Sequence, residues 1–180
     1  SNFKSILLYG VNKGFKEEVI KSNILHSFSG ELLRYDETDI IEKKKEIFES
    51  FVNGSLFDKN KAVIISRSSN KIHPFIEDFL ERDILNIQII VNADNLDKKS
   101  KLRSFFEKDK RLACVPFYED DNQTLGTFAS KFMRENNIKI SQETINLIVD
   151  RARGDRGNLR NELQKLKALS ITRNKISQED

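Results

Sequence analysis

The sequence predicts an α/β fold, in which a doubly wound, parallel five-stranded sheet is flanked by helices and followed by a small helical domain. Over residues 1–118, short apolar runs typical of strands alternate with segments whose apolar residues recur at helical spacing. Strands that alternate with helices indicate βαβ units, whose strands are parallel. Over residues 119–180, a polar joint is followed only by helical spacing. The predicted domains are therefore 1–118 and 119–180.

The five predicted strands are short apolar runs bounded by polar or turn residues. They cover residues 6–9, 31–36, 62–65, 87–91 and 112–115. The run at 62–65 is apolar at every position, which is typical of a strand buried on both faces of a sheet. Pro116 closes the last run, because proline cannot donate a ladder hydrogen bond.

Helices are predicted between these strands from apolar residues spaced three and four apart. The first begins near Gly14. The second has Asp39 as its N-cap and presents apolar residues between 40 and 51 on one face. A third covers residues 72–80, and a fourth is centred on residues 102–106.

The second domain is predicted to be a bundle of three short amphipathic helices. Their apolar stripes cover residues 125–133, 145–152 and 159–166, and Ser141 is the expected cap of the middle helix. Residues 177–180 resemble the opening of one more helix. A sheet domain followed by a helical lid is the plan of AAA+ proteins.

The composition describes a globular chain that is long enough to bury a core. Of its 180 residues, 38% are hydrophobic and 33% are charged, and the net charge of +3 permits nucleic-acid contact without requiring it. No apolar run approaches the roughly 20 residues of a membrane span, so no membrane partner is expected. Cys114 stands alone in an apolar run, which favours a buried, inert thiol and a cytoplasmic protein.

The first turn resembles a phosphate-binding loop that has lost its chemistry. A working loop reads G-x-x-x-x-G-K-[ST], in which backbone N–H groups and the lysine hold phosphates and the hydroxyl holds Mg²⁺. Here Gly10 and Gly14 are one residue too close, Phe15 stands where the lysine would be, and no Ser or Thr follows. The sequence thus predicts a degenerate, non-functional loop in a nucleotide-binding fold.

Catalytic and metal-binding groups are also missing from the expected places. The third strand would supply the acid that holds Mg²⁺, yet residues 63–67 contain none. Asp94, after the fourth strand, lies in a sequence typical of a turn. No Cys/His cluster has metal-ligand spacing. The prediction is a protein with no catalytic site, no metal and no cofactor of its own.

Two further groups are candidates for binding partners. Leu56 and Phe57 follow Ser55 in a short connection, where they either fill the local core or form an exposed apolar anchor. The residues alone leave both alternatives open. Basic residues that could contact DNA or a partner subunit gather before and within the fourth helix. These are Lys98, Lys99, Lys101 and Arg103.

Taken together, these motifs resemble the delta subunit of bacterial DNA polymerase III, the clamp-opening subunit of the clamp loader. The matching segments agree in order and spacing across nearly the whole chain. They are Leu7-Leu8-Tyr9-Gly10, Ser55-Leu56-Phe57, residues 95–103 (NLDKKSKLR), Gly154-Asp155 and residues 161–166 (NELQKL).

The resemblance implies a degenerate AAA+ domain, a helical lid and a C-terminal collar, which is absent from these 180 residues. It implies that Leu56 and Phe57, with Ser55, bind the ring-shaped sliding clamp (the beta subunit). ATP turnover would belong to sister subunits, and this chain would be a non-catalytic subunit of a DNA-directed DNA polymerase holoenzyme. Other loader subunits would join through the collar, and primer-template DNA would bind the full complex.

One motif and two alternatives remain. Residues 157–160 look like the G-x-x-R of a nucleotide-sensing lid helix, and Arg160 is interpreted as a remnant or a structural ion-pair former. The first alternative function is a divergent, active AAA+ ATPase of the helicase-loader type. The second is a DNA-binding module that uses the basic residues between Lys98 and Arg103.

Overall fold

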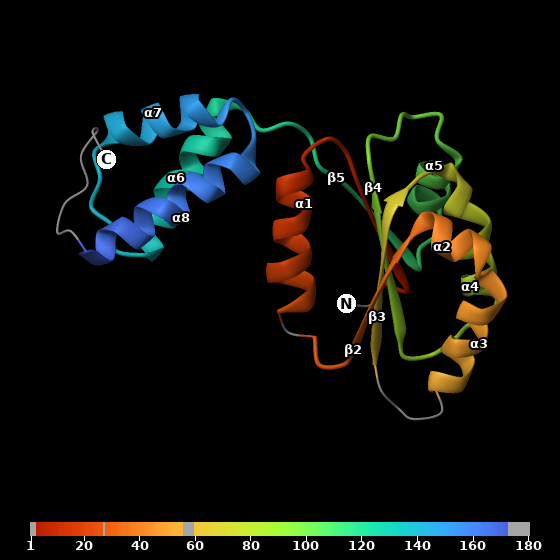
Figure 1. Cartoon of the computed structure of the whole chain (residues 1–180). Coiled ribbons are helices and arrows are strands. Elements are labelled where there is room, and N and C mark those ends of the chain that lie inside the picture. Colours follow the sequence, from red (N-terminus) through yellow and green to blue (C-terminus); the bar gives the residue numbers. More distant parts are fainter. Residues whose placement is uncertain (1–2, 27, 56–59, 173–180) are drawn as a thin grey trace. The chain divides into compact units, whose positions relative to one another are not determined.

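The computed structural model describes residues 3–26, 28–55 and 60–172, with the side chains of residues 54, 55, 171 and 172 excepted. The chain forms two compact units (Figure 1). The first contains residues 1–11 and 18–117, and the second contains residues 12–17 and 118–180. The first turn after the first strand therefore groups with the helical unit, whereas the sequence suggested a single division after residue 118.

The sheet of the first unit is parallel throughout and has the strand order β2-β3-β4-β1-β5. Its strands are β1 (Ser5–Tyr9), β2 (Glu31–Asp36), β3 (Lys61–Ser68), β4 (Ile87–Ala93) and β5 (Leu112–Pro116). In the inner strand β1, Leu7 lies opposite Val91 of β4 on one side and Cys114 of β5 on the other. The predicted five-stranded parallel sheet is confirmed.

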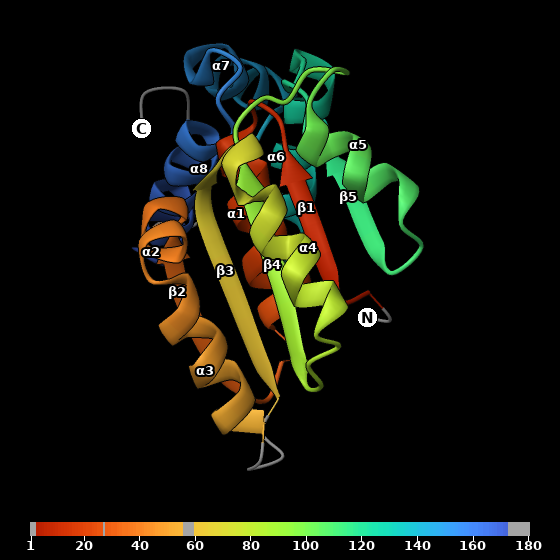
Figure 2. The ribbon, with the colours of Figure 1, turned by 90° about the vertical axis from the view of Figure 1, so that its right-hand side faces the viewer.

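Helices lie on both faces of this sheet. Figure 2 views the face that is covered by α2 (Glu37–Glu42), α3 (Lys44–Ser55), α4 (His73–Glu81) and α5 (Lys101–Lys108). Within the first unit, Figure 1 shows residues 18–25 on the opposite side, where the end of α1 (Lys13–Val19) continues into a π-helical segment, η1 (Ile20–Leu25). A short 3₁₀ turn, η2 (Asn70–Ile72), leads into α4.

The helix predicted over residues 40–51 is two helices, which is a correction to the sequence interpretation. Lys43 leaves helical geometry, with φ −110° and ψ 24°, and separates α2 from α3. Asp36, not Asp39, is the N-cap of α2; the backbone N–H of Asp36 donates to the Asp39 carboxylate at 3.2 Å in a capping box. Apolar spacing does not reveal such a break, because Ile40 and Ile47 face the same core on either side of it.

The core of the first unit lies between the sheet and helices α2–α5. Aromatic rings from α3 and α4 pack against one another there: Phe48 stacks on Phe75 with centroids 4.7 Å apart, and Phe51 meets the edge of Phe79 at 6.4 Å. These rings cover the buried faces of β1, β3 and β4. Burial of this apolar surface is the main force that holds the unit together.

The second unit has a separate core, built by α6 (Asn122–Glu135), α7 (Gln142–Ala152) and α8 (Arg156–Thr172). Ser141 caps α7 as predicted, because its hydroxyl accepts the Thr144 N–H at 3.2 Å. The three predicted helices are present. In the part of the chain that the structure describes, no helix is long and apolar enough to cross a membrane.

Candidate functional site

The turn after β1 is closed by the backbone of neighbouring strands. Gly10 has φ +123°, and a Cβ atom there would lie 2.2 Å from the carbonyl oxygen of Phe117. The Gly10 N–H donates to the Asp94 carbonyl at 3.1 Å, and the Phe117 N–H donates to the Tyr9 carbonyl at 2.7 Å. This position therefore requires glycine for its φ and for the close approach of the chain.

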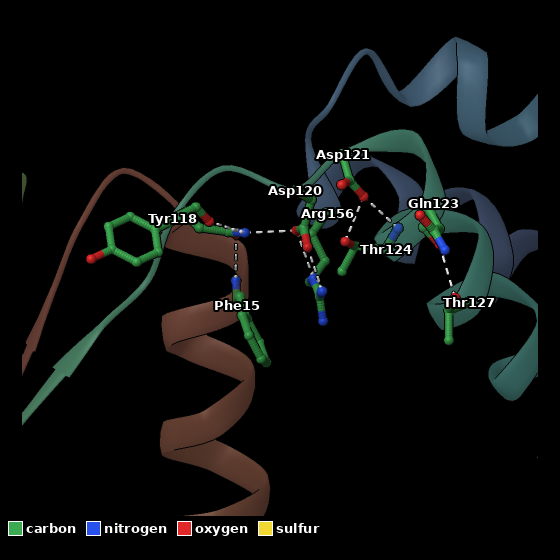
Figure 3. Close-up of polar contacts among 9 residues, drawn as sticks. Phe15, Tyr118, Asp120, Asp121, Gln123, Thr124, Thr127 and Arg156 are labelled. Carbon is green, nitrogen blue, oxygen red and sulfur yellow. Dashed lines mark hydrogen bonds and ion pairs between the residues drawn. The ribbon is translucent and has the colours of Figure 1, made fainter.

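Asn12 begins the part of this turn that belongs to the second unit. Its Oδ1 accepts the Phe15 N–H at 3.0 Å. Its Nδ2 donates to the Asp120 carboxylate at 2.6 Å and to the Tyr118 carbonyl at 3.1 Å (Figure 3). The amide side chain thus binds both the first turn of α1 and the connection that leads into α6.

Asp120 is the centre of this arrangement. Besides Asn12, it accepts two hydrogen bonds from the guanidinium of Arg156, Nε to Oδ2 at 2.8 Å and Nη2 to Oδ1 at 2.5 Å (Figure 3). The two side chains are only 7% and 4% exposed. A buried ion pair is tolerated when its geometry is good and further hydrogen bonds support it, and here Asn12 also donates to the carboxylate.

Aromatic rings hold the guanidinium of Arg156. Its central carbon lies 4.0 Å from the Phe15 ring centroid and 5.0 Å from that of Phe128. The ring that replaces the phosphate-loop lysine therefore supports a cation instead of supplying one. A Cβ on Gly14 would lie 2.8 Å from the Gly157 backbone nitrogen, so α1 and α8 also approach closely at their first turns.

The four side chains of Asn12, Phe15, Asp120 and Arg156 are called the turn network below. Sequence reasoning found Phe15 but missed the roles of Asn12, Asp120 and Arg156, and it interpreted Arg160 as a remnant or a structural ion-pair former. Arg156 forms the buried pair with Asp120, and the guanidinium carbon of Arg160 lies 5.6 Å from the Phe128 ring centroid. In the sequence, the local feature that could have drawn attention to Arg156 is its position directly before Gly157.

The end of β3, where an acid would hold Mg²⁺, carries Arg67. This residue has φ +55° at an irregularity in the β3–β4 register and forms an ion pair with Asp36. Asp94 is exposed, and its carbonyl accepts the Gly10 N–H. Among the residues of known placement, no three His, Cys, Asp or Glu side chains gather as a metal site would require.

The predicted clamp-binding pair, Leu56 and Phe57, lies outside the described residues, and Ser55 is the last residue of α3. Close to that helix end, Val52 is 48% exposed and lines a groove of about 470 Å³. Arg82 also lines this groove, with its guanidinium 4.5 Å from the Phe48 ring centroid. The described surface near the C-terminal end of α3 is therefore partly apolar.

The predicted basic group divides in two. Lys98, Lys99 and Lys101 are exposed at the entry to α5. Arg103 instead folds back: its Nε donates to Glu107 at 2.8 Å, which raises the pKa of the guanidinium, and its central carbon lies 4.9 Å from the Tyr9 ring centroid. The structure thus brings three lysines together and assigns Arg103 a structural contact.

Cys114 lies in β5 and is half-buried. Burial is the main reason why the pKa of its thiol is raised, to about 11. The thiol therefore stays protonated at neutral pH, in keeping with the expected inert role.

Comparison with known proteins agrees with the resemblance seen in the sequence. No family model matches the chain. A curated protein of Rickettsia prowazekii (strain Madrid E), described as a probable DNA polymerase III subunit delta, is 26% identical over 169 residues, which cover 91% of this chain and 50% of that protein. The chain therefore spans about half the length of this curated relative.

Solved structures share the fold. The DNA clamp loader delta protein of Bacillus subtilis superposes with a TM-score of 0.60 at 15% identity, over 98% of this chain and 56% of that one. The Holliday junction branch migration motor RuvB of Thermotoga maritima gives a TM-score of 0.62 at 12% identity, over 99% and 60%. These neighbours establish an AAA+ fold. In sequence, the chain is similar to the probable DNA polymerase III subunit delta of Rickettsia prowazekii, and in fold to the clamp loader delta protein of Bacillus subtilis.

Proposed function

We propose that this chain is the part of a clamp-loader delta subunit that binds the sliding clamp during DNA replication, without hydrolysing ATP itself. The observation that carries the proposal is the turn network in a chain that is similar to a delta subunit. At the turn where a working relative would hold phosphates, Asn12, Asp120 and Arg156 bind one another. A nucleotide-type fold of this kind serves as a scaffold for protein binding.

Clamp binding is assigned to Leu56 and Phe57. Two bulky apolar neighbours in a short connection are suited to anchor a small interface, because hot spots of this kind dominate binding energy. The partly apolar surface around Val52 supports this assignment. The physical mechanism is differential affinity: a subunit that binds the open clamp better than the closed clamp shifts the clamp toward opening.

The decisive experiment measures clamp affinity for the wild type and for Leu56→Ala/Phe57→Ala. Each alanine is expected to cost roughly 2–4 kcal/mol of binding free energy if the residue is a hot spot. Leu85→Ala is the matched control, since Leu85 is an apolar residue that is 62% exposed in a different connection. A double mutant that binds normally, or that binds weakly only because its unfolding midpoint has fallen, contradicts the assignment.

The absence of ATP hydrolysis is tested separately, by titration of the wild type with labelled ATP and Mg²⁺. No saturable binding is expected at micromolar ATP, because the phosphate-loop lysine is replaced and the turn network is bonded internally. Micromolar affinity and turnover would support the alternative of a divergent AAA+ ATPase instead.

A second candidate function is contact with DNA through Lys98, Lys99 and Lys101. The observation that favours it is their joint exposure at a well-fixed helix entry. There, Ser100 caps α5, and Asn70 accepts hydrogen bonds from the Ser100 hydroxyl at 2.7 Å and the Leu102 N–H at 3.1 Å. Contacts with primer-template DNA and with other loader subunits through a collar, and a cytoplasmic location, remain predictions from the resemblance.

A further inference from the structure

In the turn network, Asn12 and Arg156 donate hydrogen bonds to the Asp120 carboxylate, as the donors of an anion-binding site do to a bound anion. We propose that the carboxylate of Asp120 occupies a latent phosphate-type site, formed by Asn12 and Arg156, and closes it to free anions. The inference deepens the proposal that this chain does not use nucleotide, and it is independent of clamp binding. It names the ligand class that the site would take, an inorganic or organic phosphate, once the carboxylate is removed.

The donors around the carboxylate support this assignment. Asn12 Nδ2 and Arg156 Nε both donate to Oδ2 of Asp120, at 2.6 and 2.8 Å, and Arg156 Nη2 donates to Oδ1 at 2.5 Å. A planar guanidinium that binds two oxygens, together with an amide donor, recognises carboxylate and phosphate by the same geometry. Three donors thus converge on one anion.

The donors are held by contacts that do not involve the anion. The guanidinium of Arg156 lies against the rings of Phe15 and Phe128, with centroid distances of 4.0 and 5.0 Å. Asn12 is fixed through the Phe15 N–H and the Tyr118 carbonyl. Removal of the Asp120 carboxylate therefore leaves a preorganised cationic pocket, and preorganisation favours ligand binding.

The same burial explains why the wild-type site is closed. Arg156 is only 7% exposed and donates to both oxygens of the Asp120 carboxylate, so loss of this carboxylate from the buried site is strongly unfavourable. The carboxylate is part of the folded chain and already accepts hydrogen bonds from all three donors, so free phosphate would have to displace it. A variant without this carboxylate would gain stability by taking up an external anion.

The test uses this 180-residue chain with the substitution Asp120→Ala and measures the thermal unfolding midpoint in sodium phosphate and in sodium chloride of equal ionic strength. Glu119→Ala is the matched control, because Glu119 is an exposed acid next in sequence and its loss changes the net charge equally. Phosphate at millimolar concentration should raise the midpoint of Asp120→Ala by several degrees more than that of the control. The wild type and the control should respond alike.

A second variant links the response to the proposed donors. Asp120→Ala/Arg156→Gln should lose the extra stabilisation by phosphate. Asp120→Ala protein that is unfolded in chloride should refold in phosphate; protein that stays unfolded in both salts contradicts the proposal. The proposal is also overturned if Asp120→Ala responds no more than Glu119→Ala, or if the double variant still responds.

These outcomes can be told apart from failure of the proposed function. ATP binding by the wild type would contradict the lack of nucleotide use, whereas normal clamp binding by the Leu56→Ala/Phe57→Ala variant would contradict only the assigned interface. A phosphate response of the wild type above that of Glu119→Ala would mean that the site is open and that Asp120 does not close it.

Discussion

The guanidinium of Arg156 donates two hydrogen bonds to the carboxylate of Asp120, although the two residues are 36 positions apart in the chain. This pair joins the first residue of α8 to the connection before α6. Through Asn12 and Phe15 it also includes the first turn of α1, which explains why residues 12–17 group with the helical unit. The turn that binds phosphates in nucleotide-binding proteins therefore makes structural contacts within the helical unit here.

Arg156→Ala should destabilise the chain by about 3 kcal/mol, since removing one partner of a buried ion pair leaves the other charge uncompensated. Urea unfolding of the wild type and variant measures the difference. Arg151→Ala is the control, because Arg151 is exposed and its loss should have little effect. Equal losses for the two variants would show that the Asp120 pair contributes nothing beyond surface charge.

Two glycine substitutions should have opposite effects. Gly10→Ala is expected to destabilise by at least about 2 kcal/mol, because φ is +123° and the new Cβ would meet the Phe117 carbonyl oxygen at 2.2 Å. Gly126→Ala in α6 meets nothing within 4 Å and should stabilise by about 0.5–1 kcal/mol through helix propensity. Urea midpoints report both, and a neutral Gly10→Ala would contradict the described turn.

Cys114 should react slowly with thiol reagents at pH 8, and its rate should rise as the pH approaches the thiol pKa of about 11. Because this pKa is raised above the ordinary value of 9.0, the stability linked to the protonated thiol is present below pH 9 and is lost as the pH rises toward 11. Cys114→Val should remove that part of the pH dependence. A reaction at pH 8 as fast as that of urea-unfolded protein would contradict the burial of the thiol.

Lys98→Ala/Lys99→Ala should reduce the salt dependence of duplex DNA binding if these lysines contact phosphates. Each lost contact lowers the slope of log affinity against log salt by about 0.9. Lys21→Ala/Lys110→Ala removes the same charge from exposed positions elsewhere and should leave the slope near the wild-type value. Identical slopes for both double variants would mean that the entry to α5 does not bind DNA.

Much of the sheet unit could be predicted because burial leaves a pattern in the sequence. The run at 62–65 is apolar at every position, and β3 is indeed buried there on both faces. The split between α2 and α3 could not be predicted, because one non-helical residue, Lys43, does not disturb the apolar spacing around it. Ser141 was found as a cap because its bond to Thr144 is local.

The sequence alone determined the strand and helix order, the loss of the phosphate-loop lysine and the resemblance to delta subunits, since each depends on residue type or local spacing. Only the tertiary structure decided what replaced that chemistry. Asn12, Asp120 and Arg156 are distant in the chain, and no periodicity relates them. Their bonds form because folding of the helical unit buries them side by side, where each polar group must find a partner.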